Sequence, residues 1–158
     1  MTRSWTAMDS LVGEITIVVE DDAITSISFS AEPPAAATRG DDDPLLASAR
    51  DQLSDYFRGE RKEFDLPLAP RGTPFQQRVW QALCDIPYGS TTGYGAVATK
   101  LGLSAGSARA VGMANGANPV AIVVPCHRVI GSSGKLVGYA GGLERKRTLL
   151  GLEAPGLF

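Results

Sequence analysis

The chemically notable pair in this chain is Cys126 and His127, because the single histidine of the sequence directly follows a cysteine. A thiol becomes a good nucleophile once it loses its proton, and a nearby base or cation makes that loss easier. His127 can act as this base directly or through a water, and Arg128 adds a positive charge beside it. Neighbouring side chains on an extended strand point apart, so the pair can cooperate only if the chain turns here.

On its own, a Cys-His pair is either a reactive site or a buried structural cysteine beside a surface histidine. A catalytic imidazole needs a third group to orient it, and only Glu144 and Glu153 are acidic beyond the pair. Two cysteines and one histidine are too few for a disulfide scaffold, a zinc finger or a mononuclear Cys/His metal site. We therefore expect no metal and no cofactor. Cys84 is expected to be structural, with an accessory reactive thiol as the alternative.

The overall composition is that of an ordinary soluble globular protein, with 158 residues, 44% apolar and 20% charged. No stretch approaches the roughly 18 apolar residues of a membrane span. The N-terminal residues MTRSWTAMDS lack the apolar core of a secretory signal. These features predict a cytoplasmic protein with no membrane partner.

Charge divides the chain into two parts. Residues 1–70 hold 6 Lys and Arg against 14 Asp and Glu, whereas residues 71–158 hold 9 against 3. The net charges are therefore −8 and +6. The basic part is a candidate for binding a polyanion, although chance clustering on a solvated surface gives the same counts. The sign changes at Pro70-Arg71-Gly72, which is the predicted boundary between the domains 1–70 and 71–158.

The first domain is predicted to be α/β, with a small antiparallel sheet and one helix. Apolar residues alternate over 15–19 and 25–29 around a polar turn, which indicates a hairpin. Asp43 is the predicted N-cap of a helix that ends at Gly59. Alternation over 64–68 indicates a short strand, and the proline within it favours an edge strand or an extended linker.

The second domain is predicted to be mainly α-helical. Thr73 caps a helix whose apolar residues recur at helical spacing as far as Ile86. Helices over about 93–101 and 104–116, with a glycine turn between them, form a helix-turn-helix pattern. A tight turn at 131–134 predicts a hairpin that could act as a wing. The helix-turn-helix pattern alone is a weak indication of DNA binding.

Three further segments of this domain bear on function. The helix over 104–116 is rich in Ala and Gly, which suits close approach to a partner or tight packing inside the domain, and Arg109 is its one cation. β-Branched residues over 120–124 predict a buried extended segment. A last helix is expected over about 143–153. Its polar side is expected to carry three cations, Arg145, Lys146 and Arg147.

A set of motifs, in order along the chain, gives a more specific indication. Val124-Pro125-Cys126-His127-Arg128-Val129 resembles the active-site signature of the O6-alkylguanine-DNA alkyltransferases, also called methylated-DNA–protein-cysteine methyltransferases. The similarity is strong over about residues 71–153 and weaker over 1–70. It makes a purely structural Cys126 implausible. Other segments resemble family blocks in family order: Phe75-Gln76-Gln77-Arg78-Val79-Trp80, Ile86-Pro87-Tyr88-Gly89, Tyr94-Gly95, Ala108-Arg109-Ala110-Val111-Gly112, Asn118-Pro119 and Gly138-Tyr139-Ala140-Gly141-Gly142.

The resemblance implies DNA repair by a single-turnover transferase. The family's cysteine attacks the alkyl carbon on O6 of guanine, or on O4 of alkylthymine, and the thioether that remains cannot be hydrolysed. By resemblance, Cys126 is the nucleophile, His127 is its base through a water, and Glu153 is the acidic partner of the histidine. Tyr94 would donate a hydrogen bond to the leaving guanine. Asn118 would be the hinge that braces the helix-turn-helix against the active site, although a plain turn asparagine is the alternative.

The resemblance also implies how DNA is bound. Backbone groups of Cys126 and Val129 would bind the guanine edge, with Tyr139 against the base and the Ala140 amide near O6; Tyr139 also suits a core position. The damaged base would be flipped out from the minor groove, and Arg109 would fill the gap. The residues implied to contact DNA are Arg109, Ala108, Ala110, Gly112 and Arg128.

The implied folds are a ribonuclease H-like α/β domain and a winged helix-turn-helix-like domain. Three departures from the family are visible in the sequence. Gly93 stands where many members have a serine helix cap, and the interval between Tyr94 and Arg109 is about one residue longer than in some relatives. The N-terminal half also lacks the residues for the zinc site of some members.

The sequence leaves three alternative functions to be considered. A non-reactive alkyltransferase-like protein flips alkylated bases, but such proteins replace the cysteine that this chain keeps. A cysteine hydrolase or amidase would turn over repeatedly through an acyl-enzyme. A transcriptional regulator would need a further domain, for which 158 residues leave no room. The expected partner is double-stranded DNA containing O6-alkylguanine, bound by a monomer at the nucleoid without a protein partner, with cooperativity on DNA left open.

Overall fold

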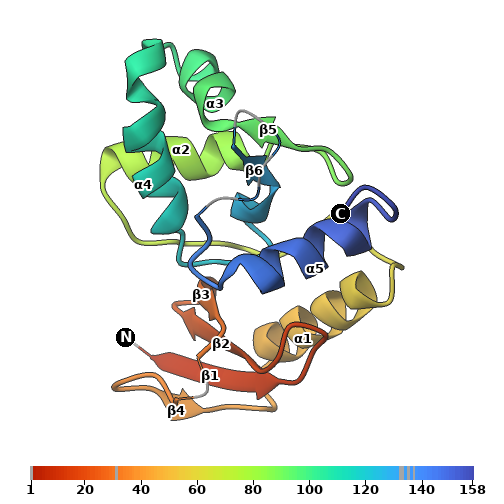
Figure 1. The fold of residues 1–158 in the computed structure, drawn as a ribbon. Helices are drawn as coiled ribbons and strands as arrows, with labels where there is room; N and C mark the ends of the chain where they lie inside the picture. The colour runs from red at the N-terminus through yellow and green to blue at the C-terminus, as the bar shows by residue number, and fades with distance from the viewer. Residues whose placement is uncertain (1, 31, 132–133, 135, 137) are drawn as a thin grey trace. The chain divides into compact units, whose positions relative to one another are not determined.

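The computed structural model describes residues 2–30, 32–131, 134, 136 and 138–158 (Figure 1). The chain divides into two compact units, Met1–Arg71 and Gly72–Phe158. Among the described residues, no helix combines the length and apolar character needed to cross a membrane.

The first unit contains a four-stranded sheet of order β3-β2-β1-β4. β2 pairs antiparallel with β1 and β3, and β4 pairs parallel with β1. All six residues of β2 are buried, as befits a strand with neighbours on both sides. The predicted hairpin is confirmed, whereas β1 has no regular apolar alternation that would predict it. The strands are β1 (Arg3–Met8), β2 (Ile15–Glu20), β3 (Ala23–Ser28) and β4 (Thr38–Arg39).

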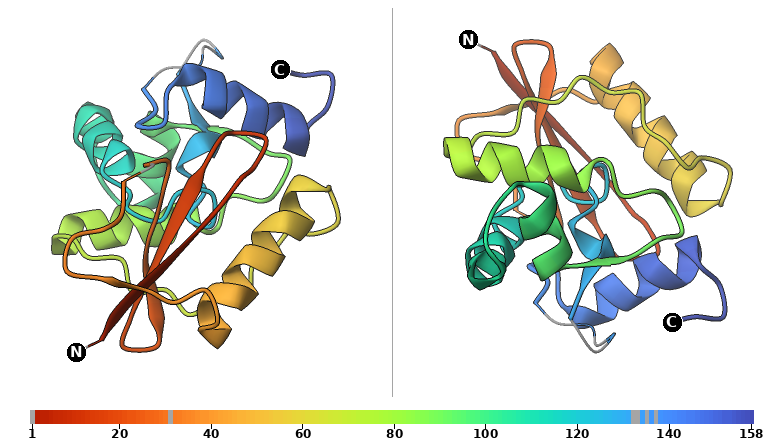
Figure 2. Two further views of the ribbon diagram at one scale, coloured as in Figure 1. Left: turned by 90° about the horizontal axis from the view of Figure 1, so that it is seen from below. Right: turned by 90° about the horizontal axis from the view of Figure 1, so that it is seen from above.

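Helix α1 (Pro44–Phe57) completes the core of this unit and lies alongside the sheet (Figure 2). Asp43 caps it as predicted, because its Oδ1 accepts hydrogen bonds from Leu45 N at 2.9 Å and Leu46 N at 3.1 Å. Gly59, with φ of 76°, follows the end of the helix. The buried residues of α1 recur at helical spacing: Leu46, Ala49, Gln52, Leu53 and Tyr56.

The segment 64–68 forms only one bridge, between Ile24 and Leu68. Ile24 N donates to Pro67 O at 2.8 Å, and Ala69 N donates to Ile24 O at 2.8 Å. Pro67 has no N–H to extend the ladder. The segment is therefore an extended linker, one of the two forms predicted for it.

Helices are the main regular elements of the second unit, as predicted. α3 and α4 lie side by side, and α2 packs on both (Figures 1 and 2). A 3-10 turn, Ala105–Ser107, leads into α4, so the α-helix begins later than predicted. The helices are α2 (Pro74–Leu83), α3 (Tyr94–Lys100), α4 (Ala108–Gly116) and α5 (Leu143–Glu153).

Local signals define both ends of α2. Gln76 N donates to Thr73 Oγ1 at 3.1 Å, and Thr73 N donates to Gln76 Oε1 at 2.9 Å, a reciprocal capping box. The helix ends at Leu83, before the predicted Ile86. Pro87 disfavours helical backbone at Ile86, whose N–H instead bonds to Leu83 O at 3.0 Å in a tighter turn.

The segment 120–124 is largely buried as predicted, but it is not extended. Val124 N donates to Val120 O at 3.1 Å, which folds the segment into a turn. Ile122 adopts φ of 73°, a strained conformation for a β-branched residue. The apolar spacing of residues 120–124 predicts that the segment is buried, but it does not predict whether the backbone is extended or turned.

Only part of the segment expected to form a wing lies within the described residues. β6 (Val129–Ile130) pairs in parallel with β5 (Thr92–Gly93). This pairing brings the residues after the Cys-His pair beside the start of α3. The predicted hairpin around 131–134 involves residues 132, 133, 135 and 137, which lie outside the described residues.

Candidate functional site

Cys126 begins a one-turn 3-10 helix, Cys126–Arg128, that leads into β6. Its N–H donates to Val124 O at 2.8 Å, which anchors the turn to the preceding segment. Cys126 is 6% exposed and His127 is fully buried. The turn that the Cys-His pair requires is therefore present, and it lies inside the second unit.

Glu153, the last residue of α5, contacts both residues that follow the cysteine. His127 Nε2 lies 2.7 Å from Glu153 Oε2. Arg128 Nε donates to Glu153 Oε1 at 2.7 Å, and Arg128 Nη2 donates to Glu153 Oε2 at 3.1 Å. Arg128 Nη1 donates to the Ile86 carbonyl at 2.7 Å. We call His127, Arg128 and Glu153 the His–Glu–Arg cluster; all three residues are buried.

These contacts determine which nitrogen of the His127 ring carries the proton. A carboxylate held by Arg128 is ionised and only accepts, so the hydrogen lies on His127 Nε2. Burial lowers the pKa of His127, and the contact with Glu153 opposes that shift. The imidazole is thus neutral near pH 7. Its Nδ1 is buried without a hydrogen-bond partner among the described residues, so it is available to accept a proton.

The acid–base state of Cys126 follows from opposing effects. Burial raises the pKa of its thiol and is the largest effect. A hydrogen bond with Asn118 and the positive charge of Lys146 lower it. The resting group is therefore a neutral thiol that needs a base to become a nucleophile.

Two asparagines hold the backbone around Cys126. Asn118 Oδ1 accepts from Val120 N at 3.0 Å. Asn118 Nδ2 donates to Val124 O at 2.8 Å and to Val120 O at 3.3 Å. Asn115, 1% exposed, donates from Nδ2 to Cys126 O at 3.3 Å. Sequence reasoning missed Asn115, whose only signal is a polar residue on the inner stripe of α4.

Lys146 corrects a prediction, because it does not lie on the polar side of α5. The residue is 0% exposed, and its Nζ donates to the Val129 carbonyl at 2.6 Å. Burial lowers its pKa, and the charge of Cys126 opposes that shift. Three consecutive cations span about 200° of a helix, so one side chain of such a run can point inward. Only the buried carbonyl acceptor shows which one does.

Arg128 also departs from its implied role as a DNA contact. Its side chain is 7% exposed, and three of its nitrogens already bind Glu153 and the Ile86 carbonyl. A phosphate contact needs an exposed cation. Arg128 instead holds the anion that orients His127.

Tyr94 lies at the start of α3, against α4. A β-carbon at Gly112 would be 3.6 Å from its ring, and one at Gly138 would be 3.8 Å from its hydroxyl. Burial raises the pKa of Tyr94, and the charge of Cys126 adds to the shift. The phenol is therefore protonated at neutral pH and can donate a hydrogen bond. Gly93 caps α3 without a side-chain hydrogen bond, as its lack of a side chain requires.

The other residues implied to form the base pocket differ in exposure. Val129 is fully buried, and its carbonyl accepts the hydrogen bond from Lys146. Tyr139 is half-buried and Ala140 is exposed. Burial raises the pKa of Tyr139, and the charge of Cys126 adds to it. Both Tyr94 and Tyr139 therefore lie within the electrostatic range of Cys126.

α4 presents a face of small residues with one cation. Arg109 and Ala110 are exposed, and Ala108 and Gly112 are half-buried. Trp80 Nε1 of α2 donates to the Ala114 carbonyl at 2.8 Å, which fixes the inner side of the helix. The residues that point inward are Val111, Ala114 and Asn115.

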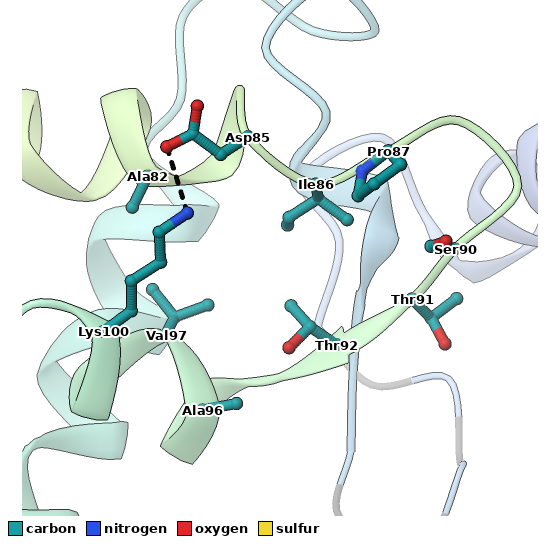
Figure 3. Close-up of a pocket in the computed structure, with 10 residues that line it drawn as sticks. All are labelled: Ala82, Asp85, Ile86, Pro87, Ser90, Thr91, Thr92, Ala96, Val97 and Lys100. Carbon is teal, nitrogen blue, oxygen red and sulfur yellow. Dashed lines mark hydrogen bonds and ion pairs between the residues drawn. The ribbon is translucent and has the colours of Figure 1, made fainter.

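A separate pocket of about 280 Å³ lies between the end of α2 and the start of α3 (Figure 3). Lys100 Nζ lies 3.0 Å from Asp85 Oδ2 in an ion pair on its wall. Its lining includes Ile86 but no member of the His–Glu–Arg cluster. Cys84, expected to be structural or an accessory reactive thiol, is exposed at the C-cap of α2. Among the described residues, no three His, Cys, Asp or Glu side chains gather where a metal ion could bind.

Two family models match the chain. Residues 4–70 match the model described as "6-O-methylguanine DNA methyltransferase, ribonuclease-like domain". Residues 74–155 match the model described as "6-O-methylguanine DNA methyltransferase, DNA binding domain". Together the two models span nearly the whole sequence.

Similar proteins carry a consistent name. The methylated-DNA–protein-cysteine methyltransferase of Mycobacterium tuberculosis H37Rv is 51% identical over 148 residues, covering 92% of this chain and 89% of the relative. The constitutive enzyme of that name from Bacillus subtilis is 46% identical over 156 residues, covering 94% of each chain. The crystal structure of Mycobacterium tuberculosis OGT in complex with DNA is 49% identical, with a TM-score of 0.87, covering 98% of this chain and 96% of that one.

Proposed function

The chain belongs to the 6-O-methylguanine DNA methyltransferase family, and we propose that it transfers the alkyl group of O6-alkylguanine in duplex DNA to Cys126, once per molecule. Methyl transfer from DNA to a protein cysteine is the activity of the family and of this chain. The assignment of the reaction to particular residues is the part that we propose.

The observation that carries the proposal is the buried contact of His127 Nε2 with Glu153, which leaves Nδ1 available. His127 Nδ1 takes the proton of the Cys126 thiol through a water, and Glu153 stabilises the imidazolium that forms. The sulfur then forms a bond to the alkyl carbon while the bond from that carbon to O6 breaks. The electron pair of the broken bond goes to guanine.

The leaving guanine carries negative charge that a hydrogen bond stabilises and that the proton released by the Cys126 thiol finally neutralises. Tyr94 is suited to donate, because burial keeps its phenol protonated at neutral pH. The product on Cys126 is a thioether, which has no carbonyl for water to attack. The protein is therefore consumed. The same chemistry extends to O4-alkylthymine, whose alkyl carbon is also bonded to an exocyclic oxygen.

DNA binding is proposed to use α4. O6 lies inside the duplex, so the base must be flipped out, which costs about a few kcal/mol in lost stacking. The exposed Arg109 would fill the gap from the minor groove, and the small residues beside it allow the helix to approach closely. The crystal structure of the Mycobacterium tuberculosis homologue in complex with DNA supports the choice of partner. We also propose a ribonuclease H-like first domain, a winged helix-turn-helix-like second domain, and a monomer in the cytoplasm.

The test is an intact mass measurement with peptide mapping after reaction with duplex DNA that contains O6-methylguanine. We expect a gain of one methyl group, located on Cys126 and saturating at one per protein. Cys126→Ala should gain none, and the exposed Cys84 serves as an internal control for non-specific alkylation. Tight binding of the lesion without a mass change would place the protein with the non-reactive damage binders. Repeated turnover on an ester or amide would indicate a hydrolase instead.

A further inference from the structure

Met113 is an unusual residue on the exposed face of α4. Its side chain is 73% exposed, which is one of the highest values for a large apolar side chain in the described residues. The exposed residues of α4 are Arg109, Ala110, Met113 and Gly116, so the face has two long side chains, one cationic and one apolar. Arg109 and Met113 are four residues apart and therefore lie one above the other on the same side of the helix.

The packing of α4 fixes Met113 in this outward position. On the inner side, Trp80 bonds to the Ala114 carbonyl and Asn115 bonds to the Cys126 carbonyl. On the flank, Gly112 lies against the Tyr94 ring. A rotation of the helix that buried Met113 would break these contacts and expose Val111, which is fully buried. The thioether is thus held at the surface by contacts that include the Asn115 bond to the Cys126 carbonyl.

The surroundings of this face suit a polyanion. The sequence holds no Asp or Glu from residue 86 to residue 143, and α2, which packs against α4, has none either. The nearest acidic residue along the chain, Asp85, is paired with Lys100. No carboxylate of these helices would repel phosphates that approach Met113.

We propose that Met113 inserts into the minor groove of the bound duplex, as an apolar contact one helical turn from Arg109. This inference rests on the proposed function, in which α4 enters that groove. Four residues of helix span about 6 Å, close to two base-pair steps, so Met113 reaches the groove next to the flipped nucleotide. An unbranched thioether adapts to different sugar and base edges, which suits binding without sequence preference. Met113 is thus a positioning residue that helps to hold the groove around the lesion.

The test compares Met113→Ala and Met113→Gln with Met113→Leu, and Leu157→Ala serves as the matched control. Leu157 is 74% exposed in the same unit, so its removal deletes a similar apolar side chain away from α4. Two readouts are needed: the Kd for duplex DNA containing O6-methylguanine, measured in a Cys126→Ala background, and the rate of Cys126 alkylation by free O6-methylguanine base.

We expect Met113→Ala and Met113→Gln to weaken duplex binding by about fivefold to tenfold, since each removes apolar area buried in the groove. Met113→Leu should stay within about twofold, because it keeps the area. Alkylation by the free base should be the same in all variants. Unchanged duplex affinity for the Ala and Gln variants would overturn the proposal, as would an equal loss with the free base. Failure of the unsubstituted protein to bind duplex DNA would instead refute the proposed function.

Discussion

Glu153 binds His127 through Nε2, and this single contact determines which side of the imidazole can do chemistry. An ionised carboxylate accepts hydrogen bonds but cannot donate them, so the opposite nitrogen, Nδ1, is left as the acceptor. Arg128 holds the same carboxylate by two hydrogen bonds and keeps it charged. The arginine therefore acts on the histidine through the glutamate.

Glu153→Gln tests this relationship with little change of shape. The amide can donate as well as accept, so it no longer selects one tautomer of His127, and it leaves the buried Arg128 without an anion. We expect the single-turnover rate of Cys126 alkylation to fall on the order of 10² to 10⁴-fold. The free energy of unfolding should fall by about 3–5 kcal/mol in urea denaturation. Glu144→Gln, in the exposed first turn of α5, is the control. A normal rate in E153Q would contradict the role of the cluster.

The pH dependence follows from the direction of the His127 shift. Burial lowers the pKa of His127 below its ordinary 6.5, so the base is neutral at pH 7 and the reaction loses it only in more acidic solution. Stability follows the same sign: below pH 6.5 the unfolded chain takes up a proton that the folded chain does not. The free energy of unfolding should therefore fall as the pH drops from 6.5 through the lower folded-state value. Urea denaturation between pH 7.5 and 5 measures this loss, which should be smaller in His127→Phe. A protein that gained stability over this range would show the opposite shift.

Lys146→Met removes a buried positive charge that favours ionisation of Cys126. We expect the pKa of the thiol to rise, and each unit of rise lowers the thiolate fraction about tenfold at a pH below that pKa. The pH dependence of alkylation by iodoacetamide, followed by mass, reports this value. Arg147→Met removes the neighbouring exposed cation of α5 and should leave the thiol pKa in place. If the two substitutions changed the thiol pKa equally, the effect would come from the overall positive charge of α5 and not from Lys146 in particular.

Asn118→Ala should destabilise the second unit, because Asn118 makes three hydrogen bonds to the turn before Cys126. At about 1 kcal/mol for each bond, the expected loss of unfolding free energy is about 3 kcal/mol. Asn118→Asp keeps the acceptor for Val120 N but loses the donor to both Val124 O and Val120 O. It also places a carboxylate oxygen against these two carbonyl oxygens, so its loss should be at least as large as that of Asn118→Ala. Chemical denaturation of the full chain gives both values. A loss within experimental error for both variants would mean that the turn holds without the side chain.

Arg109→Ala separates DNA handling from chemistry. The side chain is exposed on α4 and lies outside the His–Glu–Arg cluster, so alkylation of Cys126 by free O6-methylguanine should be unchanged. With duplex substrate the rate should fall on the order of tenfold or more, because nothing fills the gap left by the flipped base. Arg147→Ala, an exposed cation on α5 of the same unit, controls for the loss of charge alone. Similar losses in the two variants would indicate a general phosphate effect.

The elements that the sequence predicts well are those with strong local signals. Asp43 and the Thr73–Gln76 pair mark helix starts by side chains that bond to backbone within three residues. The alternation in β2 and β3 gives the hairpin. β1 and the turn at 120–124 have no such local signals. β1 depends on pairing with β2 across the sheet, and the turn depends on hydrogen bonds to Asn118.

The residues of the site also divide into those that the sequence indicates and those that only the structure shows. Motif resemblance indicates Cys126, His127 and Glu153, and the structure brings the histidine and glutamate together. Lys146 and Asn115 were missed because each acts through a buried backbone carbonyl, Val129 O or Cys126 O, that leaves no trace in residue spacing. The family resemblance implies that Arg128 contacts DNA, whereas its partner in the structure is an internal carboxylate.

The burial of Lys146 beside Cys126 gives the spent protein a distinct titration behaviour. Before reaction, the thiol can ionise, and its negative charge raises the pKa of Lys146. A thioether cannot ionise at any pH, so this support for the ammonium is lost for good. The alkylated molecule should release the Lys146 proton at a lower pH than the unreacted one. The pKa of Lys146 would therefore distinguish reacted from unreacted molecules, and a titration could measure it without detecting the alkyl group itself.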